Sequence, residues 1–166
     1  MPSISSPIAA PAVREAPVSP PPPVSLPARK PISSEPVVVQ PKLSAADLYR
    51  SALASFTEED YQGSILGFEE FVANHPEHDL ADNAQYWIGE CYYAQKNFDL
   101  AVVEFGKVDT YFESGNKVAA ALLKKGLALK ELGKDQEAIV ELEKVVSRYP
   151  NTDEAVLAGR KLSQWQ

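Results

Sequence analysis

Cysteine and long apolar runs are almost absent from this sequence. The single cysteine, Cys91, excludes an internal disulfide and a metal site built from cysteines. No stretch approaches the roughly 18 consecutive apolar residues of a membrane span, and the opening MPSISSPIAAP lacks the basic and apolar regions of an export signal. A Gly-rich phosphate loop and a Ser/His/Asp or Cys/His nucleophile set are also missing. The sequence therefore predicts a protein with no enzymatic activity and no cofactor.

Glycine and aromatic residues are missing from residues 1–43, which hold 12 of the 14 prolines. A Pro-rich segment with no large apolar face cannot bury enough surface to offset the entropy lost on ordering. We therefore predict a disordered tether over residues 1–43. Residues 44–166 hold every Trp, Tyr and Phe, and they are predicted to form one globular domain.

The tether and the domain also differ in net charge. The tether carries a net charge of +2, which leaves −9 on residues 44–166 out of the total of −7. An acidic domain disfavours nucleic acid and anionic membranes as partners. It favours a basic protein segment as the ligand.

Residues 44–166 repeat with a period of 37 residues and without gaps. Small residues recur where two helices must approach closely, as at Gly89 and Gly126. Large apolar residues recur where a helix face must be filled, as at Phe68, Phe105 and Leu142. We predict copies over about 44–78, 79–115 and 116–152, and a capping helix over 153–166 that covers the last copy.

The repeat resembles the tetratricopeptide (TPR) family, whose unit is a helix-turn-helix with characteristic small and aromatic positions. The matching residues of the middle copy are Ile88, Gly89, Tyr92, Phe98, Ala101 and Phe105. The family period is shorter, and we place the three extra residues at Asp79–Ala81, where they lengthen the first helix of the pair. The resemblance implies an all-α right-handed solenoid of three helix pairs and a C-terminal capping helix.

The resemblance also implies a binding surface, because the family binds ligands on the concave face lined by the first helix of each pair. By repeat register, the residues of that face are Tyr49, Leu53, Phe56, Asn83, Tyr86, Glu90, Tyr93, Leu123, Leu127, Lys130 and Arg160. Aromatic rings with a polar tip favour peptide binding, and an asparagine can hydrogen-bond a peptide backbone. The alternative is that some of these rings only pack between neighbouring copies. The Lys/Asn/Arg clamp that some members use for a terminal carboxylate does not appear here, which favours an internal or basic segment.

Two histidines offer the only alternative chemistry. His75 and His78 stand beside Glu77 and Asp79, and such residues can hold a metal ion. Pro76 separates them at an expected helix end, and no other copy repeats the pattern. We therefore predict solvated histidines, with a metal-dependent hydrolase as the disfavoured alternative.

Three details resemble one branch of the family: the 37-residue period, the joints HPEHDLADNAQYWIGECYY and YPNTDEAVLAGRKL, and the Pro-rich segment upstream. They are similar to the C-terminal domain of the Tol-Pal-associated cell division coordinators, known as YbgF or CpoB. The resemblance implies a periplasmic, non-enzymatic adaptor that binds TolA and couples outer-membrane constriction to septal peptidoglycan synthesis. In that family a coiled coil precedes the tether, and the resemblance implies a homo-oligomer formed through such a segment. Assembly lipoproteins of the outer membrane share the Y-P-x-[ST] joint, and a subunit of that machinery is the alternative.

Overall fold

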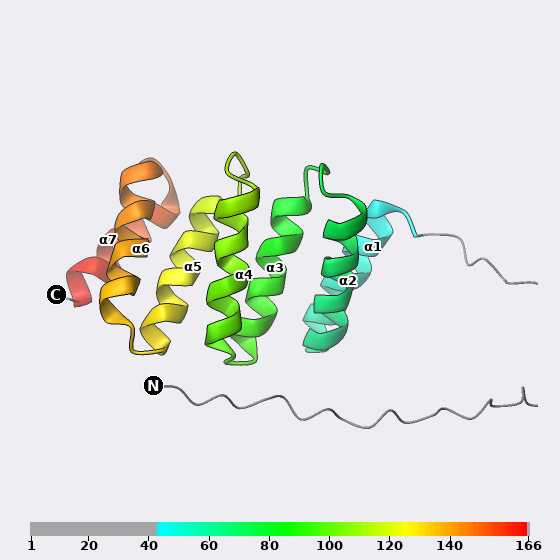
Figure 1. Cartoon of the computed structure of the whole chain (residues 1–166), viewed down its shortest axis with the longest axis horizontal. Coiled ribbons are helices and arrows are strands. Elements are labelled where there is room, and N and C mark those ends of the chain that lie inside the picture. Colours follow the sequence, from blue (N-terminus) through cyan, green and yellow to red (C-terminus); the bar gives the residue numbers. More distant parts are fainter. Residues whose placement is uncertain (1–42, 166) are drawn as a thin grey trace, which may run out of the picture. The chain divides into compact units, whose positions relative to one another are not determined.

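The computed structural model describes residues 43–165, which form seven α-helices and no strand (Figure 1). The helices are α1 Ala45–Thr57, α2 Tyr61–Asn74, α3 Ala81–Ala94, α4 Phe98–Tyr111, α5 Val118–Glu131, α6 Asp135–Arg148 and α7 Asp153–Trp165. The tether predicted over 1–43 lies outside the described residues, apart from Leu43. Within the described range, no helix is both long and apolar enough to cross a membrane. The all-α prediction of three helix pairs and a final helix is confirmed.

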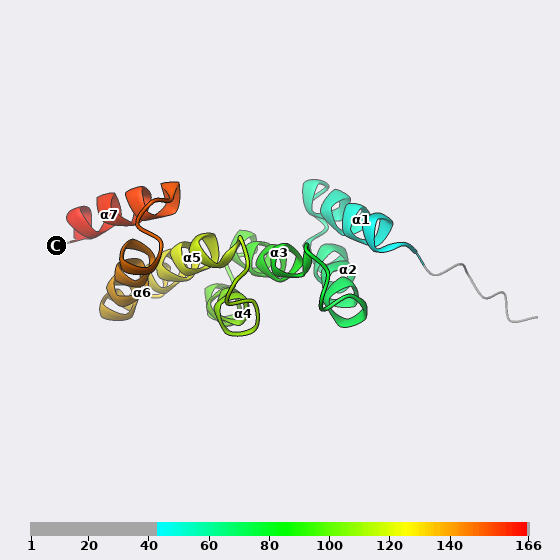
Figure 2. The same ribbon diagram turned by 90° about the horizontal axis from the view of Figure 1, so that it is seen from above.

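The helices form two layers, and each helix packs mainly against the helices before and after it in the sequence. Figure 2 shows α1, α3, α5 and α7 in one layer and α2, α4 and α6 in the other. The first layer is bent, so that α1 and α7 both lie on the side of α3 and α5 that faces away from α4. We call the surface formed by α1, α3, α5 and α7 on this side the inner face.

Each helix pair is held together at the same position of the repeat. Phe68, Phe105 and Leu142 are 37 residues apart, and none of the three is exposed to solvent. In the second and third pairs this side chain rests on a glycine of the preceding helix. A Cβ at Gly89 would lie 2.6 Å from the Phe105 ring, and one at Gly126 would lie 2.8 Å from Leu142. Burial of each of these side chains contributes about 1.5–3 kcal/mol. Because the three side chains are 37 residues apart, the core repeats with the same period as the sequence.

The first two helices begin at side-chain caps. The Ser44 hydroxyl accepts a hydrogen bond from the backbone amide of Asp47 at 3.2 Å, and the Asp60 carboxylate accepts one from Gly63 at 3.0 Å. Such bonds satisfy amides that have no partner within the helix. They fix where α1 and α2 begin.

The turn inside each pair contains one residue in the left-handed conformation. Glu59, Lys96 and Gly133 have φ angles of 61°, 59° and 72°, and they are 37 residues apart. Only glycine adopts this conformation without steric cost. The third turn therefore has the residue that its backbone requires, and the first two do not.

The extra residues of the long period lie in the connections between pairs, so the predicted lengthening of the first helix at Asp79–Ala81 is wrong. Residues 75–80 join α2 to α3, and residues 112–117 join α4 to α5; we call them joint 1 and joint 2. In joint 1 the amide of Leu80 donates to His78 Nδ1 at 3.1 Å and the amide of Ala81 donates to the His78 carbonyl at 2.8 Å. These bonds turn the chain before α3 begins.

Candidate functional site

The residues predicted to bind a ligand all lie on α1, α3, α5 and α7, the helices of the inner face. Their surroundings differ. Some side chains are already held between neighbouring helices, whereas others lie at the surface with groups that a ligand can reach. That difference decides which of them can form a site.

On α1 the predicted aromatic residues hold the first two pairs together. The Tyr49 ring packs edge-on against Phe68 and Phe71, with centroid distances of 5.3 and 5.4 Å. Its hydroxyl accepts a hydrogen bond from Trp87 Nε1 at 3.0 Å, and burial raises the pKa of this hydroxyl above its usual value. Phe56 packs on the same Trp87 at 4.9 Å. These two rings therefore serve packing between copies, which is the alternative left open by the sequence.

Each of the two tyrosines on α3 has a lysine beside it, one from the end of joint 2 and one from α5. Lys117 Nζ lies 5.7 Å from the centre of the Tyr86 ring, and Lys124 Nζ lies 5.1 Å from that of Tyr93. Lys124 also forms an ion pair with Glu90 at 2.7 Å. Burial, together with the nearby Glu90 carboxylate, raises the pKa of Tyr86 far above its usual range. Both tyrosines are therefore neutral hydrogen-bonding groups at neutral pH.

Asn83 is a half-buried residue in the first turn of the same helix. Its side-chain nitrogen donates to the Asp82 carboxylate at 2.8 Å, and its backbone amide donates to the same oxygen at 2.7 Å. Because the side-chain nitrogen of Asn83 already donates to Asp82, its side-chain oxygen is the group that can accept a hydrogen bond from a ligand. An acceptor at this place suits the N–H group of a peptide backbone.

The apolar residues predicted for the inner face are less accessible than expected. Leu123 is only 6% exposed and belongs to the core of the second and third pairs. Leu53 packs against the core of the first pair, and Leu127 is half-buried. These leucines lie beneath the inner face and expose little apolar area to a ligand.

Two cationic residues complete the predicted set. Lys130 forms an ion pair with Asp135 at 3.0 Å, and its Nζ lies 5.1 Å from the centre of the Trp165 ring. Arg160 on α7 is exposed and forms no ion pair with any residue of 43–165. Lys130 therefore ties the end of α5 to α6 and α7, whereas Arg160 is free to meet another molecule.

Two of the lysines that accompany the rings, Lys117 and Lys124, were not among the residues predicted to bind, whereas Lys130 was. Lys117 is the last residue of joint 2, Lys124 and Lys130 lie on α5, and each stands over an aromatic ring of another helix. A signal was present for Lys124, since it occupies the repeat position of Trp87 and so must face the preceding pair. Its contact with Tyr93 depends on the reach of a flexible side chain, which register does not give.

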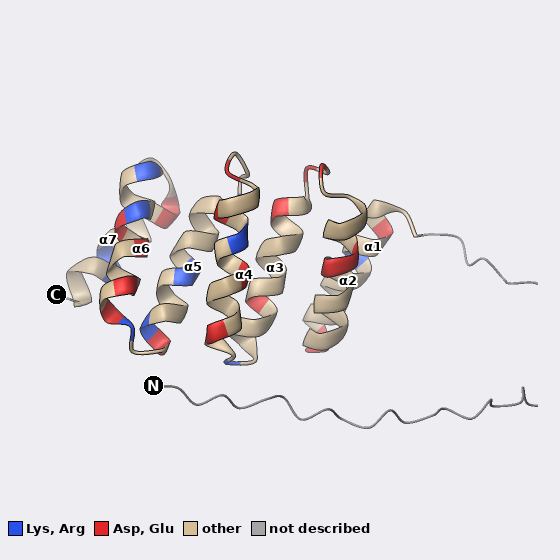
Figure 3. Cartoon of the chain, in the orientation of Figure 1, with Lys and Arg blue, Asp and Glu red and all other residues tan. Residues whose placement is uncertain are grey.

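The residues predicted to bind carry little of the acidic charge of the domain. Figure 3 shows acidic residues on the joints and on helices of both layers, including α1 and α3, and basic residues on α5 and α6. Among the residues predicted to bind, only Glu90 is acidic, and Lys124 pairs with it. The preference for a basic ligand was drawn from the overall charge, and the location of the charge does not support it for this face. An inner face with lysines over its rings favours a neutral or acidic segment.

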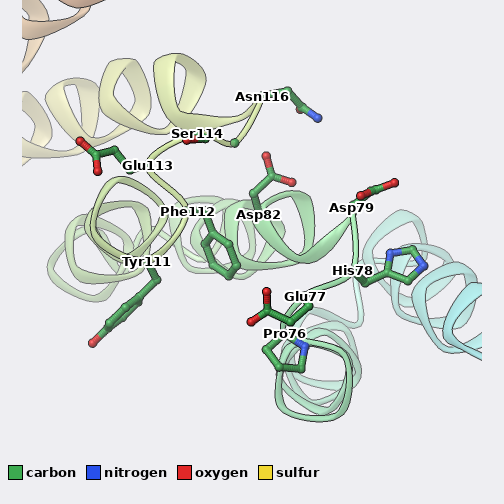
Figure 4. A pocket seen from close by; sticks show the side chains of 11 residues that line it. Pro76, Glu77, His78, Asp79, Asp82, Tyr111, Phe112, Glu113, Ser114 and Asn116 are labelled. Atoms are coloured by element: carbon green, nitrogen blue, oxygen red, sulfur yellow. The ribbon is translucent and has the colours of Figure 1, made fainter.

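A pocket of about 560 Å³ lies between joint 1 and joint 2 (Figure 4). Glu77, Asp79, Asp82 and Glu113 line it, and no Lys or Arg among the described residues does. Asp82 is 5% exposed, and it accepts a hydrogen bond from the backbone amide of Lys117 at 3.0 Å. Its carboxylate thus fastens the start of α3 to the start of α5. The other three carboxylates are solvent-exposed.

The two histidines do not form a metal centre with their acidic neighbours. Their rings lie 6.4 Å apart and both contact Phe71, and His78 Nδ1 accepts from the Leu80 amide. Within residues 43–165, no group of three or more His, Cys, Asp or Glu could hold a metal ion. The hydrolase alternative has no candidate site in this part of the chain.

Comparison with known proteins agrees with this architecture. A tetratricopeptide repeat family model matches residues 83–114 and 120–152. Among curated proteins, no sequence matches the chain. Similar solved structures include the N-terminal domain of stress-induced protein-1 (STI-1) from C. elegans, with a TM-score of 0.61 and 13% identity over 72% of this chain and 94% of that one.

Two further structures have the same fold. The second TPR domain of human RPAP3, in complex with the HSP70 peptide SGPTIEEVD, has a TM-score of 0.57 and 20% identity, covering 74% of this chain and 98% of that one. A TPR-like protein from Chlorobium tepidum has a TM-score of 0.53 and 19% identity, covering 72% and 92%. Residues 83–114 and 120–152 are therefore tetratricopeptide repeats, and residues 43–165 have the all-α tetratricopeptide fold.

Proposed function

We propose that this chain is a non-enzymatic protein-binding scaffold that holds a peptide segment against the inner face of α3 and α5. The observation that carries the proposal is the group of Tyr86, Tyr93, Lys117 and Lys124, in which half-buried rings lie next to lysines. Interface energy concentrates in a few aromatic and cationic anchors of this kind. The rings are fixed by packing before any ligand arrives, because Tyr86 rests on Phe105 at 5.5 Å and Tyr93 on Phe98 at 5.2 Å.

The geometry also indicates how a segment is held. The Asn83 amide oxygen is an acceptor for a backbone N–H, and the two tyrosines supply apolar area with a polar tip. Lys117 forms no ion pair among the described residues, so it can attract a carboxylate of the ligand. Structural neighbours support this kind of function, since RPAP3 domains have been solved bound to an HSP90 peptide and to an HSP70 peptide.

For the biological setting, we propose the cell envelope of Gram-negative bacteria. The resemblance of the joints to those of the YbgF/CpoB coordinators supports a periplasmic adaptor that binds TolA and couples outer-membrane constriction to septal peptidoglycan synthesis. The competing proposal is a TPR subunit of an outer-membrane assembly machine, which shares the Y-P-x-[ST] joint. The two proposals differ in partner and agree in the use of the inner face.

Titration calorimetry against purified TolA tests the proposal. Tyr93→Ala removes a ring that Lys124 and Phe98 hold in place, and we expect it to weaken binding by about 1–3 kcal/mol. Tyr111→Ala is the matched control, because this tyrosine is 72% exposed and lies at the end of α4 beside the joint pocket. It is expected to bind like the parent.

The outcomes separate the two parts of the proposal. If TolA binds and only Tyr111→Ala weakens binding, the site is the joint pocket and the inner-face assignment is wrong. If TolA does not bind at all, the Tol-Pal setting is wrong. A pull-down from an envelope extract, with Tyr93→Ala as the negative bait, then shows whether assembly-machine subunits are the partners.

A further inference from the structure

The last helix carries an exposed stripe that no other helix of the described chain covers. Asp153, Val156, Leu157 and Arg160 are all exposed, and they are spaced so that they share one side of α7. Val156 is 54% exposed and Leu157 is 39% exposed. An apolar centre is therefore flanked by an acidic residue one turn before it and a basic residue one turn after it.

The stripe is open because α7 has only part of the packing that α3 and α5 have. Figure 2 shows α7 at the end of the array, where it packs on α6 and α5. Its buried residues are Ala155 and Ala158. By repeat register Val156 corresponds to Ala45, which is half-buried, and to Asp82 and Ala119, which are 5% and 7% exposed. Val156 therefore occupies a position that is buried in the second and third copies.

The charges of the stripe are also unused. Neither Asp153 nor Arg160 forms an ion pair with another residue of the described chain. The midpoint between Val156 and Leu157 is equally far from both charges, about 5 Å along the helix axis at a rise of roughly 1.5 Å per residue. The stripe is therefore complementary to itself when it is turned end for end.

We propose that a second copy of this chain covers the stripe, with the two α7 helices antiparallel about a two-fold axis. The axis passes between Val156 and Leu157. Asp153 then faces Arg160 of the partner subunit, and Val156 faces Leu157 of the partner subunit. Each contact occurs twice, as in any isologous interface.

A parallel pairing is disfavoured, because it would set each charge against its like. The antiparallel pair has a modest size, since a helix of 13 residues is about 20 Å long. It buries less than the roughly 1,600 Å² of a standard interface. We therefore expect a weak dimer, populated at high micromolar concentration.

Sedimentation equilibrium of the full chain, from about 10 µM to 1 mM, tests the dimer and its contacts. Leu157→Asp places a charge at the centre of the interface and is expected to abolish dimerisation. Arg160→Asp and Asp153→Arg each break both ion pairs and are expected to raise the dissociation constant about tenfold. The double variant restores both pairs with exchanged sides, and its dissociation constant should return to within about threefold of that of the parent.

Two controls keep the test clear of folding effects. Glu70→Arg reverses an exposed charge on α2 and should leave the dissociation constant unchanged. Far-UV circular dichroism checks that α7 remains helical in Asp153→Arg, because an acidic residue in the first turn of a helix is favourable.

The proposal is overturned if the parent is monomeric up to about 1 mM, or if it dimerises equally well with Leu157→Asp. A double variant no better than the single ones would also exclude this antiparallel pairing. Of the residues predicted for the inner face, only Arg160 belongs to the stripe. The proposed peptide site rests on Tyr86, Tyr93, Lys117 and Lys124, none of which is part of the stripe. Failure of one therefore leaves the other standing.

Discussion

Substitution of Gly89 by alanine tests the close approach of α3 and α4 on which each helix pair depends. An added Cβ would lie 2.6 Å from Cδ1 and Cε1 of Phe105, whereas carbon atoms in contact are about 3.5–4.0 Å apart. Phe105 is completely buried and has Tyr86 against it at 5.5 Å. The ring must therefore move by about 1 Å into space that is already filled.

Two opposing terms set the size of the effect. Alanine is favoured over glycine inside a helix by about 1 kcal/mol, and overpacking a core costs about 1–3 kcal/mol. We expect Gly89→Ala to lower the free energy of unfolding by about 0–2 kcal/mol. Gly106→Ala on α4 supplies the same helix term without the clash, because the nearest atoms to its Cβ, on Lys125, are 3.9 Å away. The two variants should therefore differ by about 1–3 kcal/mol, which is the overpacking term alone.

Urea unfolding followed by far-UV circular dichroism measures both variants, with Trp87 fluorescence as a second probe near the first two pairs. We expect Gly106→Ala to raise the unfolding midpoint and Gly89→Ala to lower it or leave it unchanged. Equal stabilisation by both substitutions would refute the close approach. It would also remove the explanation given for the recurrence of glycine at this position of the repeat.

Two further predictions concern the joints and turns. Asp82→Ala should lower the free energy of unfolding by about 1–3 kcal/mol in the same urea assay, because the backbone amide of Lys117 loses its acceptor; unchanged stability would show that the bond between α3 and α5 contributes nothing. Gly133→Ala should lower the free energy of unfolding by about 1 kcal/mol because the φ angle of Gly133 is 72°. A Cβ at Gly159 would likewise have no atom within 4 Å, and Gly159→Ala should raise the free energy of unfolding by about the same amount. Effects of the same sign would contradict the explanation by backbone conformation.

The helices could be predicted because the core repeats with the period of the sequence. Phe68, Phe105 and Leu142 are buried at one register position, so aligning the copies also aligns the helices. The location of the three extra residues could not be obtained in this way. A period gives the length of a copy, but whether its added residues are helical depends on bonds such as that from the Leu80 amide to His78. That contact lies within the joint and has no counterpart in the apolar pattern.

The helices that form the candidate site could be predicted from the sequence. Which of their side chains a ligand can reach could be predicted much less well. Register placed the residues on the correct helices, since every one of them lies on α1, α3, α5 or α7. It could not show that the Tyr49 hydroxyl is used by Trp87 or that Leu123 is 6% exposed. Availability is set by side chains of the neighbouring copy, and these differ from copy to copy while the backbone repeats.

That difference between copies gives the inner face a direction. One register position is Tyr49 in α1, Tyr86 in α3, Leu123 in α5 and Arg160 in α7. Along this row the residues change from two aromatic rings, through the nearly buried Leu123, to the cation Arg160, and Lys117 and Lys124 bring positive charge to the rings of α3. A bound segment that follows the row therefore meets the ring of Tyr86 on α3 and positive charge toward α5 and α7. If the inner face is the binding site, an acidic residue belongs at the α5 end of the ligand, and reversing the ligand sequence should weaken binding even though its composition is unchanged.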